Sequence, residues 1–197
     1  MATLQSGITD EQAHDLLTTY NKDPFHVSHG ETVGGLMRYF AAEYDPENED
    51  FWYQVGLLHD LDWEMFDPEL HTLKTAELLA EAGASPELAK SIQTHQSDLN
   101  PDLPAPELKM EKMLYASDEL SGLITACVAM RPSKSVMDFN VKSLKKKFKT
   151  KSFAAGCNRD DIRRGAELNG LELDELFAMV IEGMKSFAPD KDTFGAE

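Results

Sequence analysis

Apolar residues recur at intervals of three and four along almost the whole chain, and this helical spacing limits the possible folds more than any other feature. In the segment 173–187, for example, one helical face carries Leu176, Phe177, Val180 and Met184. No segment alternates polar and apolar residues for long enough to indicate a β-strand. The pattern therefore predicts an all-α protein.

Capping residues and helix breakers set the limits of the expected helices. Thr9 and Gln12 form a capping box, whereas Ser85 and Pro86 supply an N-cap and a first-turn proline. Three prolines within residues 100–106 predict a loop. We expect helices at about 9–20, 26–43, 50–60, 71–81, 86–96, 106–130, within 141–151, at 158–170 and at 173–187.

The size and composition fit a single domain over residues 1–197. Because 42% of the residues are hydrophobic, the chain can bury a core, and it holds no internal repeat or low-complexity tract. Its two cysteines, Cys127 and Cys157, form no CxxC motif, which favours a reducing, cytoplasmic setting. No signal peptide and no apolar run of the roughly 20 residues that span a bilayer is present, so we expect no membrane partner.

Four of the six histidines, His29, His59, His71 and His95, lie on apolar helical stripes. A buried imidazole needs a partner for each ring nitrogen, and either a backbone carbonyl or a metal ion can supply one. A single histidine of this kind is ordinarily a core residue, whereas four in one helical domain favour a metal site. His26, one turn before His29, could bind substrate or cap its helix, and we leave it outside the ligand set.

Carboxylates accompany these histidines. Asp60 follows His59 at the end of an apolar run, where a buried carboxylate needs a cationic partner that no nearby lysine or arginine supplies. Asp118 lies inside the long helix expected at 106–130, where it faces either the site or solvent. Asp62 and Glu64 could orient ligands or could be ordinary loop acids.

The histidine His29, the pair His59-Asp60 and the later Asp118 resemble the H…HD…D signature of the HD-domain superfamily of metal-dependent phosphohydrolases. Their contexts are similar too: HVSHG begins a helix, VGLLHDLD ends one, and LYASDELSGLI lies inside a long helix. The resemblance covers about residues 23–130. It implies an HD-domain-like helical bundle, to which about residues 131–190 add a helical extension.

In dinuclear members of this superfamily, two more histidines lie between the HD pair and the final aspartate, and His71 and His95 match them. The resemblance implies that His29, His59, Asp60 and Asp118 hold a first metal, and that Asp60, His71 and His95 hold a second. A carboxylate that bridges two cations can position an activated water between them. Imidazole and carboxylate ligands suit one or two divalent transition metals, among Fe, Mn, Co, Ni and Zn.

The resemblance implies a metal-dependent phosphohydrolase that acts on a small phosphorylated metabolite, with nucleotides as the leading class. Asp60 and Asp62 are then the catalytic carboxylates, with Asp62 as a proton acceptor or as an orienting partner. The sequence reads HDLDW where many relatives have HDIGK, and it lacks the GYP motif of cyclic-di-GMP phosphodiesterases. An HD-type di-iron oxygenase, or a module that binds metal or nucleotide without turnover, remains the alternative.

A basic segment interrupts an otherwise acidic chain. The formal net charge is −16, which disfavours nucleic acid as a partner. Residues 131–164 nevertheless hold 11 basic and three acidic residues. In an HD phosphohydrolase such cations could bind the non-reacting phosphates, and we take Lys145, Lys151 and Arg163 as candidates. The alternative is an ordinary solvated helix with balancing charge.

Overall fold

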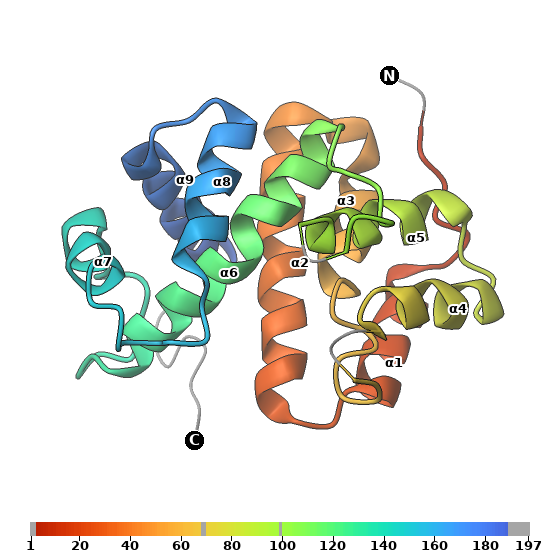
Figure 1. The fold of residues 1–197 in the computed structure, drawn as a ribbon, viewed down its shortest axis with the longest axis horizontal. Coiled ribbons are helices and arrows are strands. Elements are labelled where there is room, and N and C mark those ends of the chain that lie inside the picture. Colours follow the sequence, from red (N-terminus) through yellow and green to blue (C-terminus); the bar gives the residue numbers. More distant parts are fainter. Residues whose placement is uncertain (1–2, 68–69, 99, 189–197) are drawn as a thin grey trace. The chain divides into compact units, whose positions relative to one another are not determined.

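The computed structural model describes residues 3–67, 70–98 and 100–188. Over these residues the fold consists of α-helices without a β-strand (Figure 1), which confirms the all-α prediction. The chain divides into two compact units at the Tyr115–Ala116 bond. We describe each unit separately, and a single domain over residues 1–197 stays a prediction.

The described residues of the first unit form five complete α-helices together with short 3-10 helices, and the two caps expected from the sequence are both present. The Thr9 and Gln12 capping box forms as predicted, and the Ser85 hydroxyl accepts the Leu88 amide. The elements are α1 (Asp10–Tyr20), α2 (Pro24–Tyr44), η1 (Pro46–Asn48), α3 (Glu49–Leu57), α4 (Leu73–Glu81), α5 (Pro86–Gln93), η3 (Thr94–Gln96) and the start of α6 (Lys109–Ala129).

Within this unit α2 and α3 lie side by side (Figure 1), and glycines let their backbones approach closely. A Cβ atom on Gly56 of α3 would lie 2.7 Å from the Val33 carbonyl oxygen and 2.7 Å from Met37 Cγ of α2. A Cβ atom on Gly30 would lie 2.8 Å from the Leu57 carbonyl oxygen. Since neither position has room for a side chain, the end of α3 is fixed against α2.

Two predicted helices are shorter than expected. Helix α3 ends at Leu57, and residues 58–65 continue as turns, so the predicted helix 50–60 was too long. Helix α4 begins only at Leu73, and the Thr72 before it has a positive φ of 65°. His59, Asp60 and His71 therefore lie on turns rather than on helices.

The second unit contains the rest of α6 with α7 (Val141–Phe148), α8 (Arg159–Asn169) and α9 (Leu173–Phe187). Asn140 and Asn158 cap α7 and α8, and the left-handed Gly170 ends α8. The apolar face predicted for 173–187 is buried, from Leu176 to Met184. No helix in the described parts of the chain is long and apolar enough to cross a bilayer.

Candidate metal centre

Four imidazoles surround the carboxylate of Asp60. The Nε2 atoms of His71 and His95 lie 3.1 and 3.7 Å from Asp60 Oδ1. The Nε2 atoms of His59 and His29 lie 3.4 and 3.8 Å from Asp60 Oδ2. Each carboxylate oxygen therefore faces two imidazole nitrogens, which is the arrangement expected of a carboxylate that bridges two cations.

These five residues come from four separate segments of the first unit. His29 lies on α2, His59 and Asp60 on the turn after α3, His71 just before α4, and His95 in η3. The side chains of His59 and His95 are fully buried, whereas that of Asp60 is 21% exposed. The cluster is thus largely shielded but open to a small ligand at Asp60.

Backbone carbonyls orient two of the imidazoles. His59 Nδ1 donates to the Gly56 carbonyl at 2.7 Å, and His95 Nδ1 donates to the Ile92 carbonyl at 2.6 Å. Because a carbonyl only accepts, each Nδ1 carries the proton when the ring is neutral, and the Nε2 lone pair faces Asp60. This is the tautomer that a metal ligand bound through Nε2 requires.

A buried carboxylate orients the third imidazole. His71 Nδ1 donates to Asp62 Oδ1 at 2.6 Å, and Asp62 Oδ2 accepts the Thr75 amide at 2.8 Å in the first turn of α4. Burial would raise the pKa of Asp62, but the hydrogen bonds from His71, Thr75 and Thr72 outweigh it and lower the pKa. Both Asp62 oxygens are engaged within the protein, which favours an orienting role over proton transfer.

The carboxylates of Asp60 and Asp62 make the surrounding cluster favour positive charge. Burial would raise the pKa of Asp60, but charge on His59 and hydrogen bonds from His71 and His95 hold it well below its usual range. Burial would lower the pKa of His71, but Asp60 and Asp62 raise it to about 9. Protons and metal cations therefore compete for the same imidazole nitrogen.

The donor atoms form two overlapping groups suited to metal ions. His29, His59 and Asp60 offer atoms within 4.8 Å of one another, as do Asp60, His71 and His95. Neutral imidazoles with one shared carboxylate fit divalent Fe, Mn, Co, Ni or Zn better than Mg or Ca. The cluster could therefore hold a metal, as the sequence predicts.

The other predicted site residues lie in the second unit. Asp118 is half-buried on α6, and its backbone carbonyl accepts the Ser121 hydroxyl. Its assignment to the first metal stays a prediction. So does substrate binding by Lys145, Lys151 and Arg163.

The surroundings of the three predicted basic residues are those of a solvated surface. Lys145 pairs with Asp174 at 2.7 Å, and Arg163 pairs with Asp160 at 2.6 Å, in each case between exposed side chains. Lys151 is exposed on the turn that follows α7. The two ion pairs match the balancing charge expected of a solvated helix.

The structure adds a histidine–carboxylate pair that the sequence left undefined. His26 Nδ1 lies 2.8 Å from Glu64 Oε1. The Glu64 carboxylate also accepts the backbone amides of Lys22 and Asp23, at 2.8 and 2.9 Å. Because 38 residues separate His26 from Glu64, no local sequence pattern could have indicated this pair.

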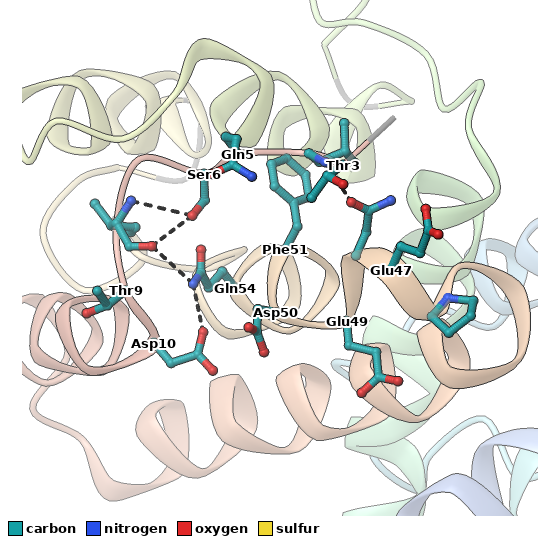
Figure 2. A pocket seen from close by; sticks show the side chains of 14 residues that line it. Thr3, Gln5, Ser6, Thr9, Asp10, Glu47, Glu49, Asp50, Phe51 and Gln54 are labelled. Carbon is teal, nitrogen blue, oxygen red and sulfur yellow. Dashed lines mark hydrogen bonds between the residues drawn. The ribbon is translucent and has the colours of Figure 1, made fainter. Parts of the chain in front are cut away.

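A separate cavity of about 730 Å³ lies in the first unit between residues 3–10 and 46–54 (Figure 2). None of the candidate metal ligands lines it. Within it, Gln54 Nε2 donates to the Ile8 carbonyl and to Asp10 Oδ1, and so ties the N-terminal segment to α3. The cavity is thus not a part of the candidate metal centre.

No protein family, no curated protein and no solved structure matches this chain. The helical fold and the His/Asp cluster are compatible with an HD domain. The resemblance thus depends on the residues and on their geometry.

We expect Asp62→Asn to weaken metal binding by about 10- to 100-fold, because the amide orients His71 without the negative charge of the carboxylate. Competition with a fluorescent chelator for Co²⁺ measures the affinity. Asp15→Asn, an exposed substitution on α1, is the control and should bind as the wild type does. Equal affinity for all three proteins would show that Asp62 does not support the centre.

Proposed function

We propose that this protein is a metal-dependent phosphohydrolase that cleaves a phosphate ester of a small metabolite. The observation that carries the proposal is the placement of four imidazoles around the single carboxylate of Asp60. When bound there, two divalent cations would supply Lewis-acid stabilisation of the phosphoryl oxygens and an activated water.

The residues of the first unit would hold the two cations in two groups. His29 and His59, which face Asp60 Oδ2, would bind one cation, and His71 and His95, which face Oδ1, would bind the other. The resemblance adds Asp118 as the further ligand of the first metal. The sequence also predicts that the basic segment binds substrate phosphate. The metal-ligand set does not depend on that prediction.

We assign to His26 the protonation of the leaving alkoxide, to which its imidazolium form would transfer the proton on Nε2. Its Nδ1 is held by Glu64, so Nε2 is the nitrogen that can reach a ligand. The ring lies edge-on to Phe25, whose own ring stacks on His29, a proposed ligand. A histidine oriented by a carboxylate beside the metal centre is suited to this task.

Metal content and hydrolysis test the proposal together. Protein purified without added metal or chelator is expected to retain about two transition-metal equivalents per chain, measured by mass spectrometry. Screening a panel of phosphate monoesters and diesters should find an ester that the protein hydrolyses. A chelator should abolish this reaction until Mn, Fe, Co, Ni or Zn is restored.

The other outcomes discriminate between the alternatives. Selective retention of iron with substrate-dependent O₂ uptake would instead favour the di-iron oxygenase. Tight metal binding without turnover of any ester would favour a binding module. Failure to retain any of the five metals after reconstitution would contradict both catalytic functions and leave a helical domain of unknown role.

A further inference from the structure

Two large apolar side chains stay exposed although each lies against an imidazole of the metal centre. Phe25 is 57% exposed, and its ring is parallel to that of His29 within 3°, with the centroids 6.3 Å apart. Trp63 is 42% exposed, and its ring meets that of His71 edge-on, with the centroids 5.0 Å apart. Both aromatic rings therefore border the proposed ligands and present apolar surface to solvent.

One carboxylate ties together the segments that carry these rings. Glu64 follows Trp63 directly, and it accepts the amides of Lys22 and Asp23 and contacts His26 Nδ1. Phe25 lies between the last two of these partners, and its own amide donates to the Asp23 carboxylate at 2.8 Å. Three hydrogen bonds thus join the turn 58–65 to the start of α2.

Burial in the core does not account for either ring. The core of this unit is filled by other side chains, among them the fully buried Phe40 and Trp52. An exposed aromatic ring gains little stability for the fold, because most of its surface remains in water. It can, however, stack on a planar ligand, since every aromatic ring has a π-face.

We propose that Phe25 and Trp63 select substrates that carry a planar aromatic ring, which stacks on them while the phosphate reaches the metals. The inference rests on the proposed function, since it places the phosphate at Asp60. Stacking does not read the edges of the ring, so purine and pyrimidine esters should be accepted alike. An ester without a ring loses these contacts.

Adenosine 5′-monophosphate and ribose 5-phosphate form a matched pair of probes, because they share the sugar phosphate and differ in the ring. The metal-loaded protein should hydrolyse the first with a kcat/KM about tenfold higher. Phe25→Leu and Trp63→Leu should each remove most of this preference through KM and leave ribose 5-phosphate within about twofold. Trp63→Phe, which keeps a ring, should retain most of the preference, and all variants should keep their metal content.

Equal kcat/KM for the two probes, or equal losses for both in the leucine variants, would overturn the inference while the phosphohydrolase proposal stands. If neither probe is hydrolysed, ligand binding measured by tryptophan fluorescence tests the inference instead. The chain has two tryptophans, and Trp52 is buried, so quenching of the fluorescence by a bound ligand reports on Trp63. Saturable quenching by adenosine 5′-monophosphate, with an affinity about tenfold lower in Phe25→Leu, supports stacking on Phe25 and Trp63 without turnover. Quenching that is absent, or equal for the two probes, overturns it.

Discussion

Asp60→Asn is expected to abolish metal binding at both positions and to lower kcat by about 10³-fold or more. The carboxylate faces all four imidazoles, two on each oxygen. An amide is neutral and has one carbonyl oxygen, so it cannot bridge two cations. Metal content by mass spectrometry and turnover of the best ester found in the screen measure both losses.

The control for this variant is Asp102→Asn, which changes an exposed aspartate in the loop before α6 and should leave both measurements unchanged. Circular dichroism and thermal unfolding of the metal-free proteins check that Asp60→Asn still folds. A folded Asp60→Asn protein that keeps about two metals and full turnover would rule out the bridging role.

His95→Gln is expected to leave about one metal per chain and to lower kcat by about 100-fold or more. The side chain is fully buried with its Nε2 only 3.2 Å from that of His71, so both rings serve the same side of Asp60. Glutamine preserves much of the volume but has no imidazole nitrogen.

The resemblance predicts that Asp118→Asn loses the other metal, the one held by His29 and His59.

His14→Gln is the matched control, because this histidine is exposed on α1 and pairs with Glu31 away from the cluster. It should retain both metals and full turnover. Two metals in the His95→Gln protein would show that His95 holds no metal. One metal in the wild-type protein would show that the site is mononuclear, with His71 and His95 as structural or substrate-side residues.

The helices were predictable because the interactions that define them are local. The capping box of Thr9 and Gln12, and the Ser85 cap of α5, each act within three residues, and the structure confirms both. The end of α3 and the start of α4 were less accessible to prediction. The Asp62 carboxylate takes the Thr75 amide 13 residues away, and such a bond leaves no periodic signal.

In the candidate site, too, the sequence could indicate some features, whereas others depend on contacts between distant residues. His29, His59, Asp60, His71 and His95 could be singled out because apolar spacing and the HD pair mark them in the sequence. Their orientation could not be predicted, since it depends on carbonyls at the ends of α3 and α5 and on Asp62. The pair of His26 with Glu64 and the exposed rings beside the cluster were also invisible to local patterns.

By itself, therefore, the sequence determined an all-α chain and the identity of the residues able to hold a metal. Only the tertiary structure decided that four imidazoles converge on Asp60. The physical reason is that helix formation and capping depend on neighbours within about four residues. Convergence instead depends on the close approach of α2 and α3 at Gly56, where packing fixes groups 30 residues apart in sequence, such as His29 and His59.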